Sequence, residues 1–262
     1  MRFRRVVIVV LDSVGVGALP DAASYGDSGA HTLAHVAAAL PGFALPQFEE
    51  MGLGGVADVP QIPPALSPRA HYGRMALASP GKDTVTGHWE IGGVVQGEAF
   101  STWPHGFSAP ILDAFTARTG FGVLGNKAAS GTAILDELGP EHLATGKLIV
   151  YTSADSVFQV AAHEEIVPLP KLYAACEAAR EILDPYRVAR VIARPFVGAP
   201  GAFQRTYNRH DYAMLPPHST LLDDLQAAGV LVVGIGKIKN IFADRGVEVS
   251  IHTAGNTDGL AR

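Results

Sequence analysis

The sequence is poor in cysteine and in long apolar runs, and each shortage excludes a class of protein. Cys176 is the only cysteine among 262 residues, so a disulfide within the chain and a zinc site built from cysteines are both impossible. No apolar run approaches the roughly 20 residues that a membrane-spanning helix needs. The first apolar run has only about six residues and no signal-peptide cleavage pattern. We therefore expect a soluble, cytoplasmic protein that does not engage a membrane.

An excess of basic charge is also missing. The formal net charge is −5, from 20 lysines and arginines against 25 aspartates and glutamates. A protein that binds nucleic acid by neutralising phosphates needs a basic face. We expect no nucleic-acid partner, although a small basic pocket for a sugar phosphate is compatible with this balance.

Several common catalytic motifs are absent. Residues 15–19 are followed by Pro20, so they do not form the Gly-x-Gly-x-x-Gly dinucleotide fingerprint. Lys237 follows Gly236 without the other residues of a phosphate-binding P-loop, and no Gly-x-Ser-x-Gly nucleophile elbow occurs. His163 precedes two glutamates, but Val167 stands where a zinc protease needs its second histidine. We interpret His163 as structural or as supporting a site indirectly.

The chain does contain alternating strand-like and helix-like segments. Residues 6–11 and 72–78 read as strands, the first buried on both faces, and residues 32–40 read as a helix stopped by a Pro-Gly pair. This alternation predicts a doubly wound α/β domain. With 48% hydrophobic residues, the chain can bury one large core or two modest ones.

From about residue 95 the character of the sequence changes, and we predict an inserted domain. Its limits are residues 97–215, which leaves residues 1–96 and 216–262 to the first domain. Inside the insertion we expect a helix at 110–119 and strands at 148–152 and 188–193, on either side of a helix that buries Cys176. After it, Ser219 is expected to cap a helix over 221–228, and 230–235 to form a buried strand.

The most reactive stretch of the sequence is residues 81–90, Gly-Lys-Asp-Thr-Val-Thr-Gly-His-Trp-Glu. A hydroxyl placed where a strand hands over to a helix lies near free backbone N–H groups, which stabilise an anion. Thr84 or Thr86 could therefore carry a phosphoryl group. The alternative is that one of these threonines simply caps the next helix.

Asp12 directly follows the predicted strand at residues 6–11. Ligands bind beyond the carboxyl ends of the strands in open α/β sheets, so Asp12 is placed to bind a metal ion. The alternative is that Asp12 caps the following helix.

Together these segments resemble the phosphopentomutase family of the alkaline phosphatase superfamily, from about Arg5 to the end of the chain. The order and joint presence of many short patterns carry the resemblance, rather than any one of them. These patterns are residues 11–17, 20–22, 81–90, 125–127, 130–132, 151–157, 162–165, 191–198 and 208–212.

The resemblance implies an alkaline phosphatase-like doubly wound core with an inserted α/β cap. It implies an isomerase of nucleoside catabolism that interconverts ribose 1-phosphate and ribose 5-phosphate, and their 2-deoxy equivalents. The phosphoryl group would pass through a phosphothreonine at Thr84 and a bisphosphate intermediate. The implied partners are pentose monophosphates and a sugar bisphosphate activator.

The resemblance also implies a metal site and a substrate site. Two Mn²⁺ ions are expected, with Asp12 and Thr84 among their ligands. The implied substrate-binding residues are Ser153, Asp155, Arg190, Arg205 and Lys237.

The chain departs from the family near its end. The family continues with a further part of the core that supplies most metal ligands, including an Asp-His-Gly sequence, and no Asp-His pair occurs in this chain. We expect an N-terminal fragment or a truncated product. The alternatives to a mutase are a catalytically dead, sugar-phosphate-binding protein and a related metal-dependent phosphatase.

Overall fold

The computed structural model describes residues 4–11 and 13–262, and the chain divides after Ala78 into two compact units. Asp12, a predicted metal ligand, lies outside the described residues. Helices and a central mixed sheet confirm the predicted α/β class. The limits of the predicted insertion, residues 97–215, stay a prediction. In the described part of the chain no helix is long and apolar enough to cross a bilayer.

The first unit consists of short helices around a small apolar cluster. Helix α1 begins at Thr32, as predicted, and its first turn is capped by the side chain of His31, which accepts a hydrogen bond from Ala34 N at 3.2 Å. Leu33 and Ala37 of α1 lie one turn apart and are buried in this cluster. The elements of this unit are η1 (Ala22–Tyr25), α1 (Thr32–Ala39), α2 (Pro46–Glu50) and η2 (Leu53–Gly55).

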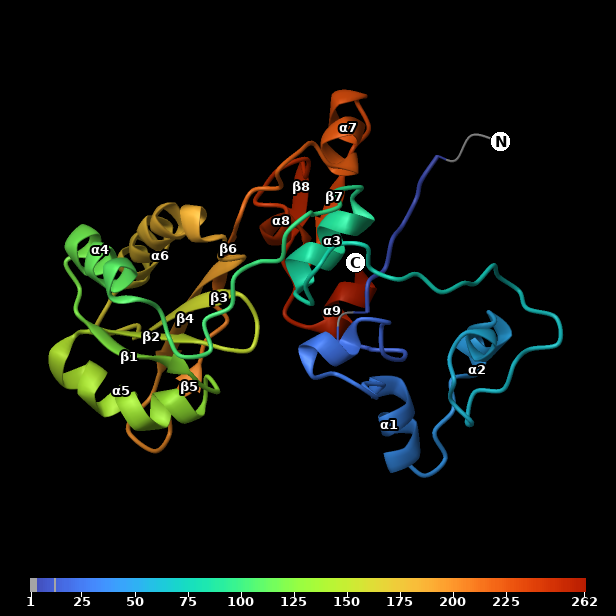
Figure 1. Ribbon diagram of the computed structural model, residues 1–262, viewed down its shortest axis with the longest axis horizontal. Helices are drawn as coiled ribbons and strands as arrows, with labels where there is room; N and C mark the ends of the chain where they lie inside the picture. Colours follow the sequence, from blue (N-terminus) through green and yellow to red (C-terminus); the bar gives the residue numbers. More distant parts are fainter. Residues whose placement is uncertain (1–3, 12) are drawn as a thin grey trace. The chain divides into compact units, whose positions relative to one another are not determined.

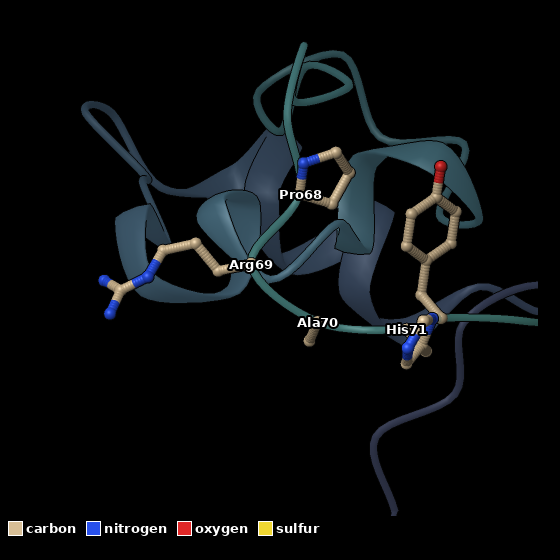
Figure 2. Close-up of a pocket in the computed structure, with 5 residues that line it drawn as sticks. Pro68, Arg69, Ala70 and His71 are labelled. Carbon is tan, nitrogen blue, oxygen red and sulfur yellow. The ribbon is translucent and has the colours of Figure 1, made fainter.

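A surface pocket in the first unit is lined by the segment from Pro68 to Tyr72 (Figure 2). Arg69 forms an exposed ion pair with Glu50 at 3.0 Å, and exposed pairs of this kind contribute little stability. None of the predicted site residues that the structure describes lines this pocket.

Two predicted strands are wrong, at residues 6–11 and 72–78. Neither run forms a strand, and most of their side chains are exposed, including 76% of Val6 and 89% of Met75. An apolar run becomes a buried strand only when neighbouring strands bond to its N–H and C=O groups. Among residues 4–11 and 13–262, no strand pairs with either run.

The second unit, Ser79–Arg262, contains a six-stranded mixed sheet with the order β1-β2-β3-β4-β5, and β6 also pairs with β4. The pairs β1–β2 and β3–β4 are parallel, whereas β2–β3, β4–β5 and β4–β6 are antiparallel. Strands β2 and β4 correspond to the predicted strands at 148–152 and 188–193. The strands are β1 (Val123–Ala128), β2 (Leu148–Thr152), β3 (Val157–His163), β4 (Arg190–Val197), β5 (Gln204–Arg205) and β6 (His210–Ala213).

Helices cover both faces of this sheet (Figure 1). Helices α4 (Ala109–Thr119) and α6 (Leu169–Leu183) pack on one face, and α5 (Ala133–Thr145) packs on the other. Cys176 of α6 is fully buried in the α4–α6 side of the core, which confirms the sequence interpretation. Burial raises the pKa of its thiol well above the usual value, so Cys176 is a structural residue.

Strand β1 is interrupted by a bulge at Asn126, whose φ of 55° lies in the left-handed region. The Asn126 side chain accepts a hydrogen bond from Phe107 N at 2.7 Å and donates one to Phe107 O at 2.9 Å. The pattern at residues 125–127 therefore ties the segment before α4 to the edge of the sheet.

Near the end of the chain a smaller parallel pair joins β7 (Val233–Ile235) to β8 (Val249–Ile251). The predicted buried strand at 230–235 is therefore shorter, and Val233 is 45% exposed. The predicted cap Ser219 is also wrong, because Thr220 forms a capping box with Asp223. The helices here are α7 (Leu221–Ala227), α8 (Ile238–Ile241) and α9 (Asn256–Ala261).

Candidate functional site

Helix α3 (Thr84–Ile91) begins within the reactive stretch, and Asp83 is its cap. Asp83 Oδ1 accepts hydrogen bonds from Val85 N at 2.9 Å and from Thr86 N at 3.0 Å. The alternative that a threonine caps this helix is therefore wrong. Thr84 is the first helical residue, so its hydroxyl is not used for capping.

Among the described residues, the Thr84 hydroxyl contacts Lys237 and His88. Lys237 Nζ, which comes from just before α8, donates to Thr84 Oγ1 at 3.3 Å. His88 Nδ1 lies 3.2 Å from Thr84 Oγ1 and 2.7 Å from the Thr84 carbonyl oxygen. Because a carbonyl oxygen only accepts, the shorter contact places the proton on Nδ1. His88 therefore orients Thr84 and cannot remove its hydroxyl proton through Nδ1.

Thr86 differs from Thr84 because its hydroxyl belongs to a buried network. Thr86 Oγ1 donates to Asp83 Oδ2 at 2.6 Å and accepts from Gln96 Nε2 at 3.0 Å. The network is extended by Ser79 and Glu90: Ser79 N and Oγ donate to Glu90 Oε2 at 2.7 and 2.6 Å. Ser79 Oγ in turn accepts from Gln96 N at 2.9 Å. These bonds fix the loop to its own helix and leave Thr84 as the reactive candidate.

Helix α3 is docked against the start of strand β4. Trp89 Nε1 donates to the carbonyl oxygen of Ile241 in α8 at 3.1 Å. Val85 and Trp89 share an apolar cluster with Ala189, the residue before Arg190. Thr84 and Arg190 therefore flank one packed cluster, although 105 positions separate them in sequence.

The structure also brings Asp155 to Arg190. Ser153 and Asp155 lie in the loop between β2 and β3, where the sequence predicted them, just after a strand. Arg190 is the first residue of β4 and is 8% exposed. Its NH2 atom lies 3.9 Å from Asp155 Oδ2, and its NH1 atom bonds to Asp211 Oδ2 at 3.0 Å.

Arg205 lies on β5, beside Tyr151 rather than in the Arg190 ion pair. A Cβ atom at Gly131 would come within 2.9 Å of the Tyr151 hydroxyl and 3.2 Å of Arg205 NH1, so a larger residue here would displace these groups. Burial raises the pKa of Tyr151, and the charges of nearby arginines partly oppose the rise. These arginines are Arg194, Arg205 and Arg209.

Sequence reasoning missed Arg194, Arg209 and Asp211. A signal existed for Arg194, because side chains four residues apart on a strand share a face and Arg194 follows Arg190 at that spacing. No local pattern placed Arg209 and Asp211 beside them, since β6 reaches β4 by a long-range pairing.

The described residues do not by themselves fit a site for two metal ions. In residues 4–11 and 13–262 there is no group of three or more His, Cys, Asp or Glu side chains able to hold one. Divalent ions take several such ligands each. The predicted ligand Thr84 is described, and Asp12 is not.

Comparison with known proteins identifies the family. No protein-family model matches the chain. The phosphopentomutase of Anaeromyxobacter dehalogenans strain 2CP-C is 60% identical over 260 residues, which are 99% of this chain and 66% of that protein. That of Syntrophotalea carbinolica is 53% identical over 262 residues, 100% of this chain and 67% of that protein. The chain thus spans about two thirds of the length of these relatives, and it belongs to the phosphopentomutase family.

Proposed function

We propose that this chain provides the phosphoryl-carrying part of a phosphopentomutase, which interconverts ribose 1-phosphate and ribose 5-phosphate and their 2-deoxy equivalents. The observation that carries the proposal is the contact of Lys237 Nζ with Thr84 Oγ1 at the first residue of α3. An ammonium group at a hydroxyl stabilises the negative charge of a phosphoryl group bound there. Family membership supports the choice of substrate.

In the proposed reaction, the phosphoryl group on Thr84 passes to the free hydroxyl of a pentose monophosphate. The bond between phosphorus and Thr84 Oγ1 breaks, a bond to the sugar oxygen forms, and the product is a bisphosphate. The other phosphoryl group then returns to Thr84. Arg190 and Arg205 hold the phosphate that is not reacting, and Ser153 and Asp155 contact the sugar hydroxyls.

Further parts of the proposal rest on the family resemblance. They are the alkaline phosphatase-like core with its inserted cap, a cytoplasmic location, a sugar bisphosphate activator, and two Mn²⁺ ions with Asp12 and Thr84 as ligands. The metal ions take part in none of the proposed steps, because the described residues do not supply enough ligands to hold them.

Replacement of Thr84 tests the proposal. Conversion of ribose 1-phosphate to ribose 5-phosphate is measured with a bisphosphate activator and Mn²⁺, and phosphothreonine is sought by mass spectrometry of the treated protein. We expect Thr84→Ala to abolish both turnover and labelling. The control Thr145→Ala, an exposed threonine at the end of α5, should retain both. Unchanged turnover in Thr84→Ala would show that Thr84 is not the phosphoryl carrier.

A second candidate function is sugar-phosphate binding without catalysis. The absence of a suitable group of metal-binding side chains from the described residues favours it. Binding of ribose 5-phosphate without turnover or labelling, together with no tight Mn²⁺ binding, would support this reading. Tight binding of two equivalents of Mn²⁺ per chain would support the mutase.

A further inference from the structure

Asp211 is a nearly buried carboxylate that holds two arginines at once. Its Oδ1 accepts from Arg209 Nε at 2.7 Å, and its Oδ2 accepts from Arg209 NH2 at 2.8 Å and from Arg190 NH1 at 3.0 Å. The Asp211 side chain is 13% exposed and that of Arg190 is 10% exposed. Both carboxylate oxygens are therefore occupied by charged donors.

The sheet register explains this position. Asp211 on β6 pairs with Ile192 on β4, and Ile192 lies midway between Arg190 and Arg194. Side chains alternate along a strand, so Arg190, Ile192 and Arg194 share one face, and Asp211 sits opposite its centre on the same face. One carboxylate thus lies between two arginines of β4, and Arg209, which immediately precedes β6, also bonds to it.

The carboxylate is kept ionised by its surroundings. Burial alone would raise the pKa of Asp211, but the Arg209 hydrogen bonds and the charges of Arg209, Arg190 and Arg194 outweigh it and hold this pKa below its usual value. Burial lowers the pKa of Arg194, and the charges of Arg209 and Arg205 lower it further. The cluster as a whole keeps an excess of positive charge, which suits a phosphate dianion. Its members are Arg190, Arg194, Arg205, Arg209, Asp155 and Asp211.

Arg190 depends on Asp211 for its orientation. Its Nε is buried and bonds to none of the described residues, while its NH2 atom is 3.9 Å from Asp155, beyond hydrogen-bonding distance. The bond from NH1 to Asp211 at 3.0 Å is therefore the contact that fixes the plane of the guanidinium group. Fixing one donor leaves the opposite edge, Nε and NH2, in a set position for an anion.

We propose that Asp211 is a positioning residue that orients Arg190 toward the phosphate of a bound pentose phosphate, with Arg209 bracing the carboxylate. The proposal rests on the proposed function for the identity of the ligand. It adds that binding depends on a carboxylate that does not touch the ligand.

The test measures ribose 5-phosphate binding by calorimetry in the full chain. We expect Asp211→Asn, which keeps the shape and removes the charge, to weaken binding about tenfold, as loss of a charge-assisted hydrogen bond does. Asp211→Glu keeps the charge and should weaken binding less. The control Asp184→Asn removes another carboxylate that pairs with a largely buried arginine, Arg180 at 2.8 Å, and should leave binding unchanged.

A double-mutant cycle separates positioning from a merely structural role. If Asp211 acts through Arg190, then Asp211→Asn in an Arg190→Met background should change the dissociation constant less than about twofold. If the affinity losses of Asp211→Asn and Arg190→Met multiply in the double variant, the proposal is overturned. Wild-type affinity would also overturn it in a folded Asp211→Asn protein or, if that variant does not fold, in a folded Arg190→Met protein, because Arg190 would then not bind the phosphate.

A second measurement needs no ligand. Nitrogen NMR of the Arg190 guanidinium should show separate Nη signals in the parent and in Asp184→Asn, because the bond to Asp211 slows rotation of the group. In Asp211→Asn these signals should merge, and unchanged signals would overturn the proposal. If the parent chain binds no ribose 5-phosphate, the proposed function fails, and the NMR result still decides whether Asp211 orients Arg190.

Discussion

At the residue scale, hydrogen bonds determine which ring nitrogen carries the proton in two buried histidines. His142 Nδ1 is 2.6 Å from the Lys147 carbonyl oxygen and must donate to it, while its Nε2 accepts from His163 N at 2.8 Å. His163 has the opposite arrangement, because its Nδ1 accepts from Glu165 N at 3.3 Å and its Nε2 faces the Gly198 carbonyl oxygen at 3.1 Å. Both side chains hold backbone segments in place, which agrees with the structural interpretation of His163.

This arrangement predicts a pH-dependent stability through His142. Burial lowers its pKa below the ordinary 6.5, and the nearby His163 adds to the effect, against the opposing hydrogen bond to Lys147. Just below pH 6.5 the unfolded chain therefore binds more protons than the folded chain. The contribution of His142 to the free energy of unfolding is fully present above pH 6.5 and is lost as the pH falls toward the pKa of His142 in the folded chain. Urea unfolding at pH 7.5 and about 5.5 measures this change.

Two histidine-to-glutamine variants, one a test and one a control, check this assignment. His142→Gln should be less stable at neutral pH and should lose part of the pH dependence. His105→Gln, at an exposed position, should keep the parent's dependence. Equal pH dependence in all three proteins would contradict the assignment.

Single residues also show what the sequence could and could not decide. Helical spacing correctly placed Cys176 in the core, because one face of an amphipathic helix is visible in the sequence. The choice between Thr84 and Thr86 stayed open, because aspartate and threonine are both good helix caps and nothing local ranks them. The structure separates them through Asp83 and Gln96, which engage Thr86.

At the element scale, the same apolar pattern had two outcomes. Residues 148–152 form β2 with strands on both sides, whereas residues 6–11 remain unpaired among the described residues. Strand propensity describes a side chain's fit to a pleated surface, and the surface itself comes from pairing over long sequence distances. Helices α1, α4 and α6 were easier to predict, because their hydrogen bonds are local.

The contact between the segment before α4 and strand β1 gives a prediction at this scale. Gly106 has a φ of +85°, and a Cβ there would lie 2.1 Å from the Asn126 carbonyl oxygen. We expect Gly106→Ala to lower the free energy of unfolding by on the order of 2–4 kcal/mol, measured by urea denaturation. Gly97→Ala, where a Cβ would meet nothing within 4 Å, is the control. Equal midpoints for the two variants would contradict this account.

At the scale of the whole molecule, the exposed apolar run at residues 6–11 affects behaviour in solution. Val7 is 72% exposed and Val9 is 66% exposed. Exposed runs of β-branched side chains with unpaired backbone groups favour self-association. In a preparation of these 262 residues we expect Val7→Lys with Val9→Lys to reduce oligomers in light scattering and the binding of a hydrophobic dye.

A control must add the same charge elsewhere. Ala117→Lys with Thr145→Lys changes two exposed positions on α4 and α5. This control should leave self-association close to that of the parent. If both pairs reduce it equally, net charge rather than the exposed run is responsible.

The distance in sequence between Thr84 and Lys237 has a consequence for the order of events during synthesis. Lys237 follows Thr84 by 153 positions, and the segment between them includes every strand of the six-stranded sheet and its packed helices. Domains fold as units while the ribosome is still adding residues. The sheet with its two packed faces can therefore form while Thr84 still lacks its lysine, and Trp89 still lacks the carbonyl of Ile241. Thr84 gains Lys237 as a partner only after the ribosome has passed Lys237. If Thr84 carries the phosphoryl group as proposed, a nascent chain cannot be phosphorylated at an assembled site before that point.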